Sequence, residues 1–152
     1  MVEVILDETG LAPDLLVIEV TESVFMDVLN ASAILEKVRA LGVHITIDDF
    51  GKGYSSFSYL KELPVDTLKI DKLFIDEIDE DKDSKAIVKA ILTIAETMDM
   101  RVVAEGIETV GQAAELLTIG CDCGQGFLFS KPLSEPHLRK FLEDGFKPEG
   151  WH

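Results

Sequence analysis

The sequence is poor in cysteine and histidine, and it has no long apolar run. Cys121 and Cys123 are its only cysteines. They are too few for a zinc site and too close together for an unstrained disulfide, so we expect buried thiols. His44, His137 and His152 form no metal-ligand pair, and we expect them to have packing or surface roles. No apolar run reaches the roughly 18 residues that span a membrane. The N-terminus also lacks the pattern of a signal peptide, and a cytoplasmic protein or domain is therefore expected.

Basic residues are scarce as well. The chain has 14 lysines and arginines against 29 aspartates and glutamates, which gives a net charge of −15. Polymeric nucleic acid and anionic membrane surfaces both bind through dense lysine and arginine, so the charge argues against these partners. A small anionic ligand held through metal ions is still compatible with it. The sequence also lacks a glycine-rich phosphate loop and a nucleophilic serine or cysteine arrangement.

What the chain does contain is a regular alternation of strand and helix patterns. With 152 residues and 47% hydrophobic content, it fits one domain with a real core. Strand patterns cover residues 15–21, 44–49, 67–71, 101–105 and 121–127. Helix patterns cover 2–9, 31–41, 56–63, 84–98 (with Ser84 as the N-cap), 110–119 and 135–143. This alternation predicts a parallel sheet with crossover helices.

The phases of the strands favour a closed barrel. Polar residues such as Thr46, Asp48 and Lys69 share one face, while aliphatic residues such as Ile45 and Ile47 share the other. Helices outside a barrel and polar side chains inside it explain this pattern, with the chemistry near the carboxyl ends of the strands. The alternative, an open doubly wound sheet, would need apolar residues on both faces. Five strands cannot close an eight-stranded barrel, so we predict an α/β fold that forms the C-terminal five βα units of a TIM-like (β/α)8 barrel.

One stretch organises the rest: a strand that runs into two adjacent carboxylates, Asp48 and Asp49, and then into a loop with Gly51 and Gly53. Neighbouring side chains on an extended backbone point to opposite sides. Both carboxylates can nevertheless reach a metal where the strand ends and twists into its loop. Hard divalent cations prefer carboxylate oxygens, and two of them about 4 Å apart can clamp a phosphoryl group. The alternative is an Asp-Asp turn that only terminates the strand.

Six polar residues are expected to point inward near the ends of the strands. Carboxylates around a divalent cation lower the pKa of a bound water and neutralise phosphate charge. A lysine that faces them can position that water or stabilise charge developing on phosphate. The alternative for the lysine is an ordinary salt bridge inside the barrel. The six residues are Glu19, Asp48, Asp49, Lys69, Glu105 and Gln125.

Five segments in this order resemble the motifs of EAL domains, the cyclic di-GMP phosphodiesterases of bacterial signalling. The resemblance implies metal-dependent hydrolysis of one phosphodiester of cyclic di-GMP, to linear pGpG, with Mg²⁺ or Mn²⁺. The segments are Glu19-Val20-Thr21-Glu22-Ser23, Asp48-Asp49-Phe50-Gly51-Lys52-Gly53-Tyr54-Ser55-Ser56, Leu68-Lys69-Ile70-Asp71, Glu105-Gly106-Ile107-Glu108-Thr109 and Gln125-Gly126-Phe127.

The resemblance also implies roles for single residues. Glu19 and Asp48 would be metal ligands, with Asp48 shared between two ions and Asp49 bound to the second. Lys69 and Glu105 would orient the attacking water, and Glu105 would lie beside the second metal.

Two further roles, and one departure, follow from the same resemblance. Glu108 would anchor the loop after the Asp-Asp pair, and Gln125 would contact substrate or water. The Glu-Ala-Leu segment and a metal-binding asparagine of the family are absent and belong upstream of Met1. We therefore expect a partial two-metal site with weak occupancy and a chain that is inactive alone. A catalytically inactive receptor and an oligomerisation module are the alternatives. Open edges at residues 15–20 and 121–127 predict a homodimer or larger assembly.

Overall fold

The structure is a computed structural model of the chain, and it describes residues 1–52 and 60–145. Its sheet has four strands, all parallel, in the order β1-β2-β3-β4. The strands are β1 (Val17–Thr21), β2 (His44–Phe50), β3 (Thr67–Ile70) and β4 (Arg101–Ala104). The α-helices are α1 (Val2–Thr9), α2 (Val28–Arg39), α4 (Lys72–Ile75), α5 (Lys82–Thr97), α6 (Val110–Thr118) and α7 (Glu135–Asp144). The 3-10 helices are η1 (Pro13–Leu15) and η2 (Glu22–Asp27).

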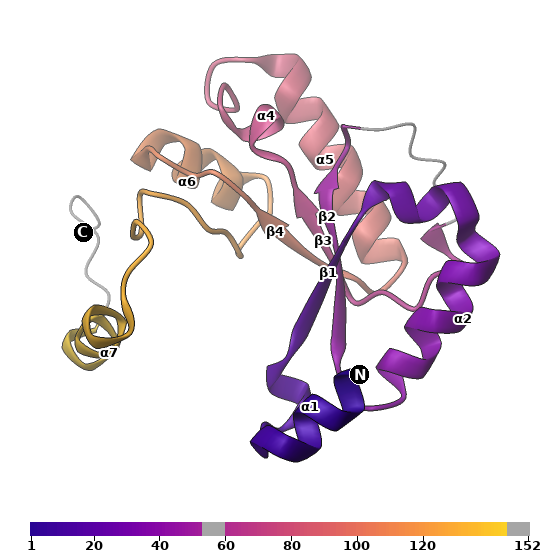
Figure 1. Cartoon of the computed structure of the whole chain (residues 1–152). Coiled ribbons are helices and arrows are strands. Elements are labelled where there is room, and N and C mark those ends of the chain that lie inside the picture. The colour runs from indigo at the N-terminus through magenta and orange to yellow at the C-terminus, as the bar shows by residue number, and fades with distance from the viewer. Residues whose placement is uncertain (53–59, 146–152) are drawn as a thin grey trace.

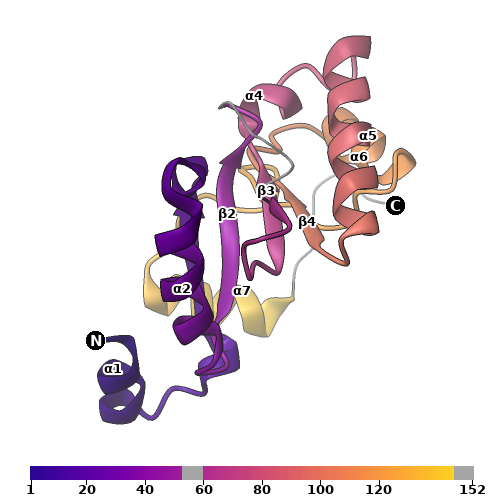
Figure 2. The same ribbon diagram turned by 90° about the vertical axis from the view of Figure 1, so that its right-hand side faces the viewer.

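The order of the strands distinguishes between the two expected architectures. In a doubly wound sheet the order reverses partway, so that helices cover both faces. Here each strand lies beside the next one in the chain, and α2 and α5 cover the same face (Figures 1 and 2). This sequential parallel order is that of a β/α barrel wall and confirms the predicted fold class.

The helix-covered face of the sheet carries the core. Ile45, Ile47, Leu68 and Ile70 are fully buried, as the alternation of the strands predicts. Burial of each such side chain contributes about 1.5–3 kcal/mol. On the opposite face Thr46 and Lys69 are buried polar residues. This face is therefore the polar side of the sheet.

Two helices, α2 and α5, begin earlier than the sequence predicts, because aspartates cap them. Helix α5 starts at Lys82, and the Asp81 carboxylate accepts hydrogen bonds from the backbone N–H groups of Asp83 and Ser84. Ser84 was predicted as the cap; that prediction is wrong, since the Ser84 hydroxyl itself donates to Asp81. Asp27 caps α2 in the same way.

The predicted fifth strand, residues 121–127, is not a strand. The segment returns beside β4 and forms one isolated parallel bridge, between Ala104 and Gly124. Ala104 N–H donates to the Cys123 carbonyl at 3.0 Å, and Gln125 N–H donates to the Ala104 carbonyl at 2.8 Å. Beyond this bridge the pairing is irregular, because Gly106, with φ +75°, takes the chain out of the extended conformation. Ile107 N–H still donates to the Gln125 carbonyl at 3.1 Å, and Leu128 N–H donates to the Ile107 carbonyl at 2.9 Å. Cys121 is buried, but Cys123 is exposed, which corrects the expectation of two buried thiols.

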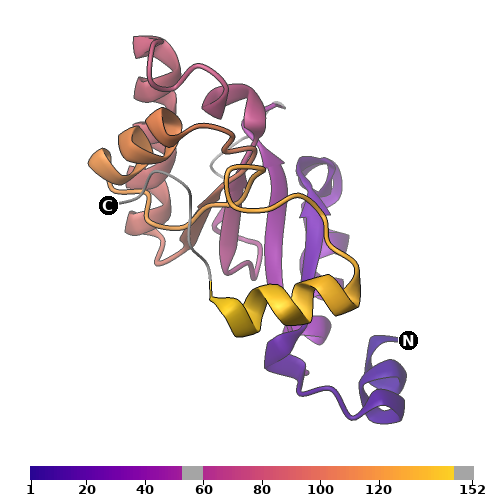
Figure 3. The ribbon, with the colours of Figure 1, turned by 90° about the vertical axis from the view of Figure 1, so that its left-hand side faces the viewer.

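The C-terminal helix stands apart from this core. Helix α7 lies on the side of the sheet opposite α2 and α5 (Figure 3), and none of its residues is buried. Its range agrees with the predicted one. Half of the helix predicted for residues 56–63, residues 56–59, lies outside the described residues. Among the described residues, no helix is long and apolar enough to cross a membrane.

Candidate functional site

An irregularity at the end of β2 brings its two carboxylates together. The pairing of β2 with β3 shifts register between Ile47 and Phe50, and Asp49 adopts a left-handed conformation with φ +56°. Such a bulge places an extra residue in one strand and re-aims the side chains around it. As a result, carboxylate oxygens of Asp48, Asp49 and Glu105 lie within 4.8 Å of one another. The expectation that both aspartates reach one place at the strand end agrees with this geometry.

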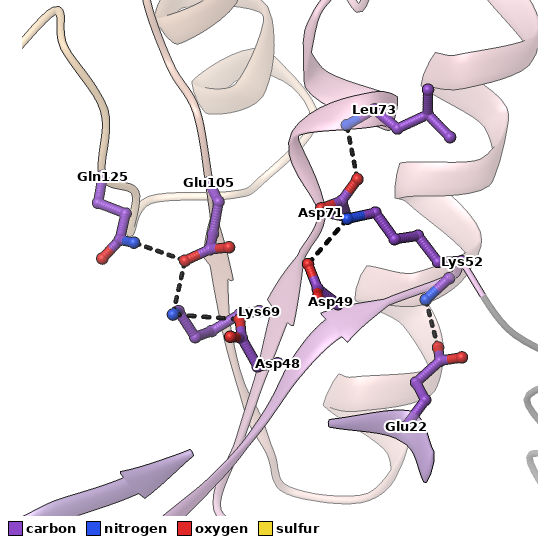
Figure 4. A network of polar contacts seen from close by, with 10 residues as sticks. Glu22, Asp48, Asp49, Lys52, Lys69, Asp71, Leu73, Glu105 and Gln125 are labelled. Carbon is purple, nitrogen blue, oxygen red and sulfur yellow. Dashed lines mark hydrogen bonds and ion pairs between the residues drawn. The ribbon is translucent and has the colours of Figure 1, made fainter. Parts of the chain in front are cut away.

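Lys69 is the centre of this acidic group. Its side chain is 9% exposed, and its Nζ lies 2.6 Å from Glu105 Oε1 and 2.7 Å from Glu19 Oε1. A third carboxylate oxygen, Asp48 Oδ1, lies 3.2 Å away. Figure 4 shows Lys69 projecting from its strand between Asp48 and Glu105. Burial on its own would lower the pKa of Lys69, but the attraction of the Glu105, Glu19 and Asp48 carboxylates outweighs it and raises that pKa. The ammonium therefore holds its proton firmly at neutral pH.

The Glu105 carboxylate is the most perturbed acid of the group. Burial raises its pKa, and the charges on Asp48 and Glu19 raise it further, while Lys69 partly offsets both effects. Gln125 Nε2 donates to Glu105 Oε1 at 2.5 Å, which fixes the orientation of this carboxylate (Figure 4). A carboxylate held by both an ammonium and an amide is well placed to accept a hydrogen bond from a water molecule.

Two cavities reach this group of side chains. One, of about 480 Å³, is lined by Glu105, Gln125, Phe127, Lys72 and Lys131, among others. The second, of about 1100 Å³, extends along the polar face of the sheet and includes Glu19, Thr46, Lys69 and Gln125 in its lining. Gln125 lines both cavities, Glu105 lines the first, and Glu19 and Lys69 line the second.

The structure also places a second lysine at the group, which the sequence reasoning did not single out. Lys52 Nζ lies 3.0 Å from Asp49 Oδ1 and 2.7 Å from Asp71 Oδ2. Asp71 is buried, and its other oxygen accepts the backbone N–H of Leu73 at 2.9 Å (Figure 4). The alternation of the third strand places Asp71 on the same face as Lys69, so its position near the group was predictable. Lys52 lies in a loop between two glycines, where no sequence period predicts the position of its side chain.

The described part of the loop after the Asp-Asp pair is bound by Glu22. Gly51 N–H donates to Glu22 Oε1 at 2.5 Å. Glu108, which was expected to anchor that loop, forms an ion pair with Lys72. Since residues 53–59 lie outside the described residues, the anchoring role of Glu108 stays a prediction.

The residues present fit a divalent cation. Asp48 Oδ1 is buried and has no partner in hydrogen-bond geometry, although it lies in ion-pair range of Lys69. A buried carboxylate oxygen in that position can accept a metal–oxygen bond without losing a hydrogen bond. Asp49 and Glu105 supply further hard oxygen ligands within reach. Glu19, also predicted as a ligand, is not part of this close group and is tied to it through Lys69.

Comparison with known proteins agrees with this geometry. A family model described as "EAL domain" matches residues 1–132. The bifunctional diguanylate cyclase/cyclic di-GMP phosphodiesterase MucR of Pseudomonas aeruginosa is 49% identical over 130 residues, which cover 85% of this chain and 19% of MucR. The chain spans about a fifth of the length of the curated relatives it matches.

Solved structures also resemble the chain in fold and in sequence. The crystal structure of the EAL domain of Mycobacterium smegmatis DcpA has a TM-score of 0.90 at 41% identity, over 97% of this chain and 66% of that one. Klebsiella pneumoniae BlrP1, in a manganese and cyclic di-GMP complex, has a TM-score of 0.79 at 36% identity, over 86% of this chain and 34% of that one.

Proposed function

This chain belongs to the EAL domain family, and on that premise we propose that it supplies part of the active site of a cyclic di-GMP phosphodiesterase. The observation that carries the proposal is the acidic group around Lys69, with three carboxylates inside 4.8 Å and a buried ammonium 2.6 Å from one of them. The relatives support the substrate: MucR is a cyclic di-GMP phosphodiesterase by name, and the BlrP1 structure contains cyclic di-GMP.

The proposed metal is Mg²⁺ or Mn²⁺, held by Asp48, Asp49 and Glu105. A divalent cation bound there lowers the pKa of a coordinated water and neutralises charge on the phosphodiester. The manganese in BlrP1 supports this assignment. Glu19 would complete the ligand set by giving up its hydrogen bond with Lys69 and binding the metal. Asp48 would be shared between two ions.

The chain's own residues would contribute orientation and fixed charge. Lys69 keeps its proton on Nζ and presents a positive charge where the phosphoryl oxygens gather charge during attack by water. Glu105, fixed by Lys69 and Gln125, accepts a hydrogen bond from the attacking water and so aligns it with phosphorus. One P–O3′ bond breaks as the water oxygen bonds to phosphorus, and a proton released by the water balances the one gained by O3′, which leaves a 5′-phosphate and a 3′-hydroxyl in linear pGpG. Gln125 would also contact the substrate, because it lines both cavities.

We also propose that the chain self-associates. Strand β1 has a described partner only in β2, and Val17 on it is 51% exposed. An unpaired, apolar strand edge is a template for pairing with another chain.

The experiment measures cyclic di-GMP hydrolysis by chromatography in a protein that carries the complete family domain. Lys69→Ala and Glu105→Gln should each lower kcat by about 10²–10³-fold, the scale of losing one preorganised charge. Lys85→Ala is the matched control, because Lys85 pairs with Glu115 between α5 and α6, outside the site. Near-normal turnover in either site variant would remove that residue from the mechanism. The 152-residue chain alone is expected to be inactive.

A further inference from the structure

Lys52 has an unusual pair of partners. Its ammonium bridges two carboxylates, Asp49 and Asp71, at 3.0 and 2.7 Å. One of them, Asp49, belongs to the close acidic group, whereas Asp71 is not part of that group. The Lys52 side chain is half exposed and comes from the loop that follows β2.

The two partners differ in how firmly they are held. Asp71 is buried, caps α4 and accepts the N–H of Leu73, so its position is fixed by the backbone. Asp49 is 44% exposed. Among the described residues, its carboxylate accepts no backbone hydrogen bond and contacts the side chains of Lys52 and Asp71. Lys52 is thus anchored at one end, on Asp71, and makes an exchangeable contact at the other.

Lys69 offers a useful contrast. It is buried and is surrounded by three carboxylates, so its charge belongs to the centre of the site. Lys52 approaches from the solvent side and occupies a single oxygen of one member of the acidic group. A cation at Asp49 Oδ1 and the Lys52 ammonium would require the same lone pairs.

We propose that Lys52 is a built-in competitor of the divalent cation at Asp49. Without metal its ammonium neutralises Asp49. With metal it gives up that oxygen but stays on Asp71, a few ångströms away, where its charge repels the bound cation. Lys52 therefore sets the metal affinity of the site. This inference rests on the proposed function, because it assumes that the acidic group binds metal.

The expected size of the effect follows from Coulomb's law. A single charge about 5 Å from a divalent cation in a largely water-like dielectric changes its affinity by about tenfold. The effect should shrink as added salt screens the interaction.

The test is a titration of Mn²⁺ into the chain, with free Mn²⁺ followed by its electron paramagnetic resonance signal. Lys52→Met should bind Mn²⁺ about tenfold more tightly than the unaltered chain. Lys52→Arg, which keeps the charge, should restore the original affinity. Lys85→Met removes the same unit of net charge away from the site and should change the affinity by less than about twofold. Raising the KCl concentration should reduce the difference in Mn²⁺ affinity between Lys52→Met and the unaltered chain.

The outcomes separate this inference from the proposed function. Equal or weaker Mn²⁺ binding by Lys52→Met than by the unaltered chain overturns the competition while leaving the metal site in place. An equal gain in Lys85→Met overturns it too, because bulk charge would then explain the effect. No Mn²⁺ binding by any of these variants refutes the metal site and the inference together. Lys52→Gln serves as a second neutral variant, and far-UV circular dichroism checks that each one folds.

Discussion

Lys69 is the residue on which the acidic group depends most. It is the only described lysine that contacts Glu19, Asp48 and Glu105 together. Without its ammonium these carboxylates would face one another with no positive charge between them. Repulsion among the carboxylates therefore lowers the free energy of unfolding, and the Lys69 ammonium offsets this loss in addition to any role that Lys69 has in the chemistry.

We expect Lys69→Met to destabilise the chain by about 2–4 kcal/mol at neutral pH, because removal of one partner leaves buried charges uncompensated. The measurement is urea unfolding. The loss should become smaller in acid, because burial raises the pKa of Glu105 and its carboxylate is protonated there.

Lys85→Met is the control, since Lys85 pairs with the single carboxylate of Glu115, whereas Lys69 lies among three carboxylates. Loss of this one pair should cost about 1 kcal/mol. A loss for Lys69→Met no larger than that for Lys85→Met would show that the acidic group is solvated well enough to dispense with its lysine.

Much of the site was predictable from the sequence because strand alternation fixes which way a side chain points. Lys69 and Glu105 lie on the polar face of their strands, and the pairing of parallel strands brings their carboxyl ends together. Lys52 and Glu22 were not predictable in this way. They lie in a loop and a 3-10 helix, where the position of a long side chain depends on tertiary contacts and not on a period.

Among the secondary-structure elements, α5 shows how an aspartate determines where a helix begins. The hydroxyl of Ser84 and the N–H groups of Ser84 and Asp83 all donate to Asp81, and together they lower its pKa. Both Asp81 and Ser84 were chemically suitable caps. Asp81 is the cap because its carboxylate accepts all three hydrogen bonds, whereas the Ser84 hydroxyl is itself one of the donors.

The depressed pKa of Asp81 predicts a pH dependence. Its folded pKa lies below the unfolded value of 3.8, so its contribution to stability is present above pH 3.8 and is lost as pH falls through the folded pKa. Asp81→Asn keeps a capping oxygen but cannot titrate. The chain should therefore be more stable than Asp81→Asn at neutral pH, and the gap should close in acid. Urea unfolding over a pH series measures this, and a gap that does not vary with pH would contradict it.

Gly126 controls how the segment after β4 returns to the sheet. A Cβ at this position would overlap backbone atoms of Ile107. Gly126→Ala should therefore shift the segment that carries Gln125 and cost about 1–3 kcal/mol, as overpacking does. Thermal or urea unfolding gives the value.

Gly120→Ala is the comparison for Gly126→Ala. Gly120 has open space around it but a φ of +93°, so only the backbone conformation opposes the alanine. It should cost about 1–2 kcal/mol and leave Gln125 in place. Unchanged stability in Gly126→Ala would mean that the return segment adjusts freely.

The same segment explains why the fifth strand was predicted wrongly. Residues 121–127 have the alternation of a strand, and their backbone does pair at Ala104. What the alternation could not reveal is that the partner strand ends at that point. Gly106 leaves the extended conformation, so the later hydrogen bonds between Ile107 and the returning segment do not form a regular ladder.

For the molecule as a whole, the open side of β1 is the feature that most affects behaviour in solution. His44 N–H donates to the Leu16 carbonyl, so Leu16 points its backbone toward β2 and, by alternation, Val17 points its own away. Hydrogen-bonding groups on that side have no described strand beside them.

We expect the chain to form a homodimer or a larger assembly through this edge. Light scattering on a size-exclusion column should give at least twice the 16.8 kDa of one chain. Val17→Pro removes one N–H from the open side without breaking the ladder to β2, and it should shift the population toward the monomer. A stably folded monomer of the unaltered chain would contradict the prediction.

The bulge in β2 has a consequence for how such a chain can change over generations. Loss of one of the two aspartates would leave Ile47, a single aspartate and Phe50 in plain alternation, so Phe50, which is 1% exposed, would still face the core. The extra residue is therefore needed for the second carboxylate and not for the core. Descendants of this sequence can abandon the metal by point substitution or by a single deletion at this place, and either change leaves the hydrophobic face of β2 intact.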